Sequence, residues 1–284
     1  MRASTRLRQL LAQPDTVLAP GVYDAIGARL AEQAGCPALY MTGAGVSASL
    51  GYPDYGLVTM GEMVERAGVI ARSVAVPLVS DADTGYGNEL NVTRTVREFE
   101  MRGVAAIHLE DQVSPKRCGH LEGKVLVSRD EFVSKIRAAV AARRDPDFVV
   151  IARTDARAVD GLDEAIDRAN AALEAGADMA FVESPASLDE VAAIPRRVRG
   201  PCLLNLVQGG KTPLLELSQV QALGYRLAIV PGALLVPTIV AADAALADLV
   251  RTRRIAPPPP GLDVRQVFRR FGAKEWDAIR ERFE

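Results

Sequence analysis

Short apolar runs alternate with amphipathic segments along most of this chain. Eight of the runs are about four residues long and bounded by polar or glycine-containing stretches, which is typical of strands buried on both faces. The predicted strands are Thr16 to Leu18, Ala38 to Met41, Leu78 to Asp81, Ala105 to Leu109, Val149 to Ala152, Met179 to Val182, Cys202 to Asn205 and Leu227 to Val230. Helical spacing lies between them, as in AIGARLAEQAG, VTRTVREFEMRG and LDEAIDRANAALEAG, each closed by a glycine suited to a helix C-cap.

This alternation predicts an α/β protein with a parallel sheet and crossover helices. Eight such units favour a closed (β/α)8 TIM-type barrel, which we place over residues 1–255. The alternative is an open, doubly wound sheet. No G-x-G-x-x-G follows the first strand, and polar residues recur at the carboxyl ends of at least five strands instead of at one switch point. The pattern therefore favours the barrel.

A proline-rich linker separates the barrel from a C-terminal extension, which we place over residues 256–284. The linker, APPPPG from Ala256 to Gly261, is stiff and extended. The segment after it mixes apolar and charged residues at helical spacing. Such a helix either packs on its own barrel or reaches across to a neighbouring subunit, and the spacing alone favours neither.

Charge and composition exclude several classes of protein. The chain carries 34 Lys and Arg against 36 Asp and Glu, and no basic stretch is interleaved with aromatics, so nucleic acid is not an expected partner. We find no signal peptide at the N-terminus, and the apolar stretch LAIVPGALLVPTIVAADAALADLV contains two prolines and two aspartates, which disfavours a membrane span. Cys36, Cys118 and Cys202 are too few and scattered for a disulfide framework, which indicates a reducing cytoplasm.

Polar side chains gather where the predicted strands end, and this is where barrel active sites are built. They are Tyr40 with Thr42 to Gly45, Asp81 and Asp83, His108 and Glu110, Arg153 with Asp155, Glu183, and Asn205. Any one carboxylate could be a helix N-cap or part of a loop salt bridge. Four of them on matching strand ends, with few cations there, favour a hard divalent metal such as Mg²⁺.

A second cluster lies in EDQVSPKRCGHLEGK, residues 110–124. Lys116, Arg117 and His120 flank Cys118, and nearby positive charge lowers the pKa of a thiol. We therefore expect a thiolate-prone Cys118 that acts as a base or acid near neutral pH. The plainer interpretation is a small buried cysteine. A zinc site is excluded because the chain has two histidines and no cysteine pair with ligand spacing.

PKRCGH, together with DADTGYGN, HLEDQ and IARTDA, resembles the isocitrate lyase and phosphoenolpyruvate mutase superfamily over about Tyr23 to Gly232. The resemblance implies a Mg²⁺-dependent barrel enzyme, with Mn²⁺ as a substitute metal, that acts on small carboxylates. It also implies a homotetramer in which C-terminal helices are exchanged between neighbours.

The resemblance further assigns roles to individual residues. Asp81, Asp83 and Glu110 match the metal shell, directly or through water, with Asp54 nearby among the substrate-binding residues. Thr42, Gly43, Ala44 and Arg153 match the groups that hold a substrate carboxylate, and Tyr40, Gly119, Glu183 and Asn205 match residues that line the substrate. Cys118 matches the catalytic acid/base of the carbon–carbon lyases, with Lys116, His120 and Glu110 as the other catalytic groups.

Departures from the family pattern narrow the function. The mutases of the phosphonopyruvate type generally lack the loop cysteine, so Cys118 favours a lyase. LEGK after His120 lacks a basic residue that 2-methylisocitrate lyases tend to carry, which favours a 2-hydroxydicarboxylate substrate. A second departure is Gln208 in NLVQGGKTP, which replaces the usual Glu.

A carboxyphosphonoenolpyruvate mutase-like enzyme is the nearest alternative function. An oxaloacetate hydrolase or decarboxylase is less favoured because Pro231 stands where hydrolases tend to carry Ser. A noncatalytic dicarboxylate-binding barrel is the remaining alternative.

Overall fold

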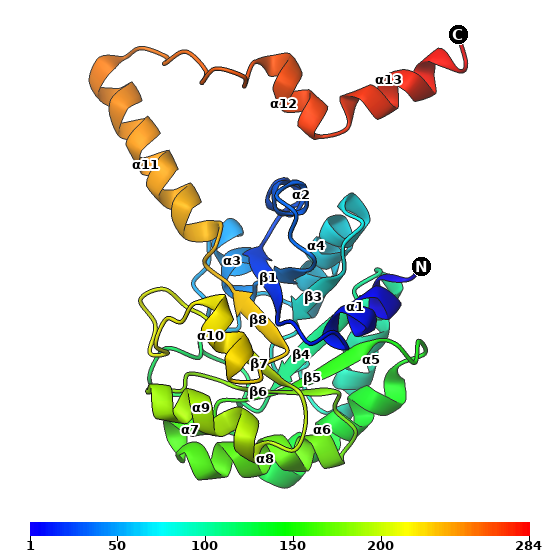
Figure 1. Ribbon diagram of the computed structural model, residues 1–284, viewed down its shortest axis with the longest axis vertical. Helices are drawn as coiled ribbons and strands as arrows, with labels where there is room; N and C mark the ends of the chain where they lie inside the picture. Colours follow the sequence, from blue (N-terminus) through cyan, green and yellow to red (C-terminus); the bar gives the residue numbers. More distant parts are fainter. The chain divides into compact units, whose positions relative to one another are not determined.

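The computed structural model describes all 284 residues and contains a closed barrel of eight parallel strands (Figure 1). The strands follow one another around the barrel in sequence order, and β8 closes it by pairing with β1. They are β1 Val17–Val22, β2 Leu39–Met41, β3 Leu78–Asp81, β4 Ala106–Glu110, β5 Val149–Thr154, β6 Met179–Val182, β7 Cys202–Asn205 and β8 Leu227–Val230. The predicted (β/α)8 TIM-type fold is thereby confirmed.

The helices before β8 surround the barrel, and three more helices follow β8 along the chain (Figure 1). They are α1 Ala3–Leu11, α2 Ala25–Gln33, α3 Gly43–Ser49, α4 Met60–Ser73, α5 Glu89–Met101, α6 Arg129–Ala142, α7 Ala156–Val159, α8 Leu162–Glu174, α9 Leu188–Arg197, α10 Leu217–Ala222, α11 Leu235–Thr252, α12 Val264–Arg270 and α13 Ala273–Glu281. None of these helices combines the length and apolar character that crossing a membrane requires.

Three strands end later than the sequence predicts: β4 by one residue, at Glu110, and β1 and β5 by more. β1 continues past Pro20 and Gly21 to Val22. A Cβ at Gly21 would lie 2.2 Å from the Pro231 carbonyl oxygen, so only glycine fits where the two backbones meet. β5 continues through Arg153 and Thr154, which are buried although polar. Because Arg153 and Thr154 are polar, the sequence pattern ended the predicted strand at Ala152, before its true end.

Strand side chains alternate between the barrel interior and the surrounding helices. On β5, Val149 and Ile151 belong to the interior cluster, whereas Val150 and Ala152 pack in the layer beneath the helices. Continuing this period of two places Arg153 inward at the carboxyl end of the strand. The same alternation on β4 and β6 carries inward-facing side chains up to Glu110 and Glu183.

Helix α1 adds apolar side chains to the interior cluster. Leu7 is fully buried within it, and Arg8 donates to Asp178 Oδ1 at 2.9 Å. We expect Leu7→Ala to lower the free energy of unfolding by about 2–5 kcal/mol, because it removes buried contacts and leaves a cavity. Urea titration would measure this loss. Leu90→Ala, at a leucine that is 79% exposed, is the control and should change stability by only a few tenths of a kcal/mol.

The chain divides into two compact units, Met1–Leu235 and Val236–Glu284. The first contains the whole barrel. In the second, α12 and α13 contact each other and no side chain is buried. The predicted boundary between residues 255 and 256, which assigns α11 to the barrel, stays a prediction.

Candidate active site

The strand alternation brings the predicted polar side chains together at the carboxyl end of the barrel. The strand register places Asp81 beside His108 and Glu110 beside Arg153. Most of the predicted residues are buried: Tyr40, Thr42, Gly43, Asp81, Asp83, Glu110, Lys116, Gly119, Arg153, Glu183 and Asn205. Ala44, Asp54, Cys118 and His120 are half-buried. Buried charges need partners, and the contacts between these groups define the site.

Asp81 on β3 is surrounded by donors. Its Oδ1 accepts from the Asp83 N–H at 2.9 Å, and its Oδ2 accepts from the Gly43 N–H at 3.3 Å. A Cβ on Gly43 would lie 2.5 Å from this oxygen, so glycine permits the approach. Burial opposes ionisation, but His108, Lys116 and Arg153 outweigh it and lower the pKa of Asp81 to about 2. Asp81 therefore stays a carboxylate at neutral pH.

Tyr40 and His108 form a pair beside this carboxylate. The Tyr40 hydroxyl lies 2.9 Å from His108 Nε2 and 3.5 Å from Asp81 Oδ2. Burial lowers the pKa of His108 to about 4, which leaves the imidazole neutral at neutral pH. Its other nitrogen, Nδ1, is buried without a partner. His108 was noted among the strand-end polar residues but was not assigned to the site, and its even spacing with Glu110 was the available signal.

Arg153 on β5 is surrounded by three carboxyl groups. Its guanidinium nitrogens lie 3.0 Å from Glu110 Oε2, 3.0 Å from Asp155 Oδ2 and 3.6 Å from Glu183 Oε2. Arg153 also stacks 5.3 Å from the centre of the Phe181 ring. We call Arg153, Glu110, Asp155 and Glu183 the arginine cluster. Asp155 occupies the fork of this guanidinium, through Nε at 3.0 Å and Nη2 at 3.3 Å, while Nη1 faces Glu110.

We expect Arg153→Met to lower the free energy of unfolding by about 3–5 kcal/mol, because it leaves buried carboxyl groups without their cation. Arg153 helps to lower the pKa of Asp155 against the effect of burial, so this carboxylate stabilises the fold at neutral pH and loses that contribution as pH falls. The deficit of the variant should therefore shrink as pH drops through about 4.

Urea titrations from pH 7 down to about pH 2 would measure this trend, because the lowered pKa of Asp155 lies below its ordinary value. Arg157→Met is the matched control, because Arg157 forms a half-buried pair with Glu190 outside the site and should cost roughly 1 kcal/mol. The prediction would be contradicted if Arg153→Met and Arg157→Met lost the same free energy of unfolding, or if the loss in Arg153→Met did not change with pH.

Lys116 joins the loop after β4 to the strand ends. Its ammonium contacts Asp54 Oδ1 at 2.5 Å and Asp83 Oδ1 at 3.0 Å. Burial disfavours its charge, but Asp83, Glu110 and Asp81 raise the pKa of Lys116 well above its usual range. Burial also raises the pKa of Asp83, to about 6. The loop before α4 and the loop that carries Cys118 are therefore bound together by a buried ion pair.

The predicted thiolate preference of Cys118 is wrong. Burial, followed by the negative charge of Asp54, raises the pKa of Cys118. The cations beside it in sequence face elsewhere, because Lys116 contacts aspartates and Arg117 stacks 5.8 Å from the centre of the Tyr55 ring. Burial also lowers the pKa of His120, which therefore adds no charge at neutral pH. Cys118 is thus a protonated thiol at neutral pH, which suits an acid.

His120 links the Cys118 loop to the ends of β6 and β7. Its Nδ1 accepts from the Lys211 N–H at 3.0 Å, so the neutral ring carries its proton on Nε2, which lies 3.4 Å from Glu183 Oε1. Glu183 also accepts from the Asn205 amide at 2.9 Å. His120 therefore presents an N–H beside a carboxylate.

Thr42, Gly43 and Ala44 begin helix α3. The Thr42 hydroxyl caps the helix by accepting from the Gly45 N–H at 3.3 Å. Gly43 faces Asp81, whereas Ala44 lies in the first turn and is half-buried. Of this predicted carboxylate-binding segment, the structure thus brings Gly43 into contact with the rest of the site.

The carboxylates are suited to a hard cation without enclosing one by themselves. No group of three His, Cys, Asp or Glu side chains stands at ligand spacing. However, Asp83 Oδ1 and both carboxyl oxygens of Glu110 are buried and accept no hydrogen bond, although each residue has a cation nearby. Mg²⁺ keeps several waters and uses only one or two carboxylates, so these oxygens fit it.

Sequence reasoning missed three residues of the site, Lys124, Ser184 and Asp111. Lys124 is a buried lysine in a glycine-containing loop, and Ser184 follows β6 with a positive φ of 56°. Asp111 follows β4 and accepts from Thr154 Oγ1 at 2.6 Å. Nothing in the local pattern marks Lys124, whereas Ser184 and Asp111 each stand next to a predicted site residue.

A (β/α)8 barrel with buried carboxylates, cations and a thiol at its carboxyl end has the architecture and site of a barrel enzyme. Residues 7–250 match the family model of phosphoenolpyruvate phosphomutase, and the chain belongs to this family. It is 50% identical over 250 residues to 2,3-dimethylmalate lyase of Eubacterium barkeri, covering 88% of this chain and 85% of that protein. It is 49% identical over 225 residues to 2-methylisocitrate lyase of Aeropyrum pernix, covering 79% and 72%.

Solved structures agree with this membership. Oxaloacetate acetylhydrolase in complex with 3,3-difluorooxalacetate superposes with a TM-score of 0.94 and 40% identity, over 98% of this chain and 95% of that one. Phosphonopyruvate hydrolase in complex with oxalate and Mg²⁺ superposes with a TM-score of 0.91 and 32% identity, over 100% and 99%. The two relatives named as lyases support a carbon–carbon lyase.

Proposed function

We propose that this protein is a Mg²⁺-dependent lyase that cleaves a small 2-hydroxydicarboxylate, of the dimethylmalate or methylisocitrate kind, into a 2-oxoacid and a second carboxylate. The observation that carries the proposal is the position of a protonated Cys118 on a loop that contacts both the arginine cluster and the Asp54–Lys116–Asp83 ion pairs. The names of the lyase relatives support the reaction class.

Asp81, Asp83 and Glu110 would hold the metal, Mg²⁺ or in its place Mn²⁺. When bound, the metal would supply a Lewis acid that favours binding of a 2-hydroxy acid and offsets negative charge on its hydroxyl oxygen. The buried oxygens of Asp83 and Glu110 that accept no hydrogen bond support this role. The Mg²⁺ in the related phosphonopyruvate hydrolase complex supports the choice of metal.

The chain's own residues would bind the substrate and move its protons. Arg153 would bind one carboxylate, together with the segment of Thr42, Gly43 and Ala44. A basic group takes the hydroxyl proton as the bond to the neighbouring carbon breaks, and Cys118 then gives its proton to the carbanion that leaves. Three further residues would assist proton transfer and stabilise charge on the substrate: Lys116, His120 and Glu110. The substrate would be lined by Tyr40, Asp54, Gly119, Glu183 and Asn205.

The cations of the site favour a dicarboxylate over a tricarboxylate. Lys116 is occupied by Asp54 and Asp83, and Lys211 by Glu122, while Arg117 stacks on Tyr55. Asp155 occupies Nε and Nη2 of Arg153, so one substrate carboxylate at most would bind this guanidinium, through Nη1 beside Glu110. The first carboxylate would bind the metal with the hydroxyl group, and the second would bind Arg153.

Oxaloacetate hydrolysis is the second candidate function, since a related structure is an oxaloacetate acetylhydrolase. Pro231 argues against it, because it replaces the serine expected of hydrolases and contacts Gly21 through its backbone, where no side chain fits. A mutase reaction on a carboxyphosphonate and a noncatalytic dicarboxylate-binding role are further alternatives. Gln208 replaces the usual Glu, so this chain carries no carboxylate at that position.

We place the protein in the cytoplasm as a homotetramer. The three cysteines are free, which fits a reducing compartment. Exposed apolar side chains of the second unit have no partner within it: Ile239, Val240, Leu246, Leu249, Val250, Phe268, Trp276 and Phe283. Exchange of these helices between neighbouring subunits would bury them.

The test is a direct assay of products. The purified protein is incubated with Mg²⁺ and each of 2,3-dimethylmalate, 2-methylisocitrate, malate, oxaloacetate and a carboxyphosphonate, and products are identified by mass spectrometry. A 2-oxoacid released from a 2-hydroxy acid, and formed at least about a hundredfold more slowly by Cys118→Ser, would establish the lyase. Oxalate released from oxaloacetate, or turnover of the phosphonate alone, would overturn it.

A further inference from the structure

The backbone carbonyl of Gly119 is held by two side chains. Lys124 Nζ donates to it from within the same loop, and Ser184 Oγ donates to it at 3.1 Å from the end of β6. A Cβ at Gly119 would lie 2.5 Å from Glu183 Cγ and 2.6 Å from an Arg153 nitrogen. The peptide between Cys118 and His120 is thus pressed against the arginine cluster, and two donors fix it there.

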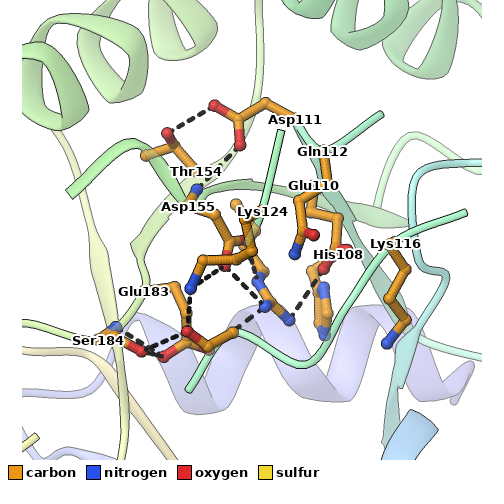
Figure 2. A network of polar contacts seen from close by, with 12 residues as sticks. His108, Glu110, Asp111, Gln112, Lys116, Lys124, Thr154, Asp155, Glu183 and Ser184 are labelled. Carbon is orange, nitrogen blue, oxygen red and sulfur yellow. Dashed lines mark hydrogen bonds and ion pairs between the residues drawn. The ribbon is translucent and has the colours of Figure 1, made fainter. Parts of the chain in front are cut away.

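Lys124 also reaches the end of β5. Its ammonium lies 3.5 Å from Asp155 Oδ1, and only 2% of its side chain is exposed (Figure 2). Asp155 is the residue that Arg153 contacts through two nitrogens, at 3.0 and 3.3 Å. One ammonium therefore connects the loop carbonyl to the carboxylate that orients Arg153.

Asp155 is a rigid anchor for this connection. Its N–H donates to Asp111 Oδ1 at 2.8 Å (Figure 2). Arg168 on α8 donates to Asp111 Oδ2 at 3.2 Å. Asp111 and Asp155 are both fully buried. A buried, fully bonded arrangement of this kind has few alternative geometries.

Ser184 supplies an independent sign that this contact matters. It is a non-glycine residue with a φ of 56°, a backbone conformation that is costly unless the surroundings require it. This conformation places Oγ beside the Gly119 carbonyl and 3.4 Å from His120 Nδ1. The strained backbone of Ser184 therefore lies at its hydrogen bond to the loop that carries Cys118.

We propose that Lys124 is a positioning residue, which holds the Cys118–His120 segment against the arginine cluster by joining the Gly119 carbonyl to Asp155. The inference rests on the proposed function for the reaction that Cys118 serves. The alternative is a lysine that only neutralises Asp155, in which case the loop would keep its position without it.

The test is the alkylation rate of each cysteine by iodoacetamide in the full chain without substrate, resolved by peptide mass spectrometry. Lys124→Met should raise the rate at Cys118 about tenfold, the ratio expected from losing one hydrogen bond to a charged group. Cys36 and Cys202 lie outside the loop and should keep their rates. Loss of a positive charge would by itself disfavour the thiolate, so a faster reaction reports release of the loop.

Two further variants sharpen the result. Lys124→Gln retains a donor but no charge and should give a smaller rise, and Ser184→Ala removes the second donor and should also expose Cys118. Lys135→Met is the matched control, because Lys135 is an equally buried lysine on α6. An unchanged Cys118 rate in Lys124→Met would overturn the proposal, whatever Ser184→Ala does, and so would an equal rise at all three cysteines.

Kinetics provide the second measurement. With the substrate found by the product assay, Lys124→Met should lower kcat about tenfold and change KM less, because the proton donor is displaced while Arg153 remains. Alkylation needs no substrate, so a failed lyase assignment would leave the positioning role testable. An unchanged kcat together with an exposed Cys118 would overturn the link to catalysis.

Discussion

Removing divalent cations should abolish turnover, by roughly a thousandfold or more, and adding Mg²⁺ should restore it. The charges of the site give the reason. Six carboxyl groups of the site stand against three lysine or arginine side chains: Asp54, Asp81, Asp83, Glu110, Asp155 and Glu183 against Lys116, Lys124 and Arg153. A dianionic substrate entering this site would be repelled unless a further cation came with it.

Binding can be measured apart from activity. A ligand that binds only the folded state raises the midpoint of thermal unfolding, so Mg²⁺ should raise Tm in the chelator-treated protein. Asp83→Asn and Glu110→Gln should weaken both this shift and the recovery of activity. Asp178→Asn, at a carboxylate that pairs with Arg8 and Arg143, should keep the shift. Full turnover in the presence of a chelator would refute a metal-dependent reaction.

The barrel could be predicted because its pattern is local. Each strand is a short apolar run, and every predicted strand is present. The inward position of Glu110, Arg153 and Glu183 follows from a period of two along each strand, so the gathering of these residues could be predicted as well. Only the strand ends were misjudged, where buried polar residues such as Thr154 continue a strand.

The electrostatics of the site could not be predicted, because they depend on which way long side chains turn. Lys116 stands two residues from Cys118 in sequence, yet its ammonium pairs with Asp54 and Asp83. Lys124 was not recognised for the same reason, since its contact with Asp155 joins segments 31 positions apart. Sequence neighbours on a loop are thus a poor guide to the charge that a thiol experiences.

Replacing Cys118 should give the largest loss of activity from a single substitution. We expect Cys118→Ala to lower kcat by about 10²–10⁴-fold, the usual contribution of a positioned acid or base. KM should change little, because the substrate carboxylate would be bound by Arg153 and not by the thiol. Steady-state kinetics with the substrate from the product assay would measure both, and Cys36→Ala, outside the site, is the control.

The pH profile tests the direction of proton transfer. Burial and Asp54 raise the pKa of Cys118, so the thiol holds its proton at neutral pH and can donate it. Activity that needs this proton is lost as pH rises through the thiol pKa. We therefore expect kcat/KM to fall only above the ordinary cysteine pKa of about 8.5. This alkaline limb should vanish in Cys118→Ser, because the hydroxyl does not ionise in that range. If the limb persists in Cys118→Ser, or if activity instead rises with pH as an ionised thiol would require, Cys118 is not the acid.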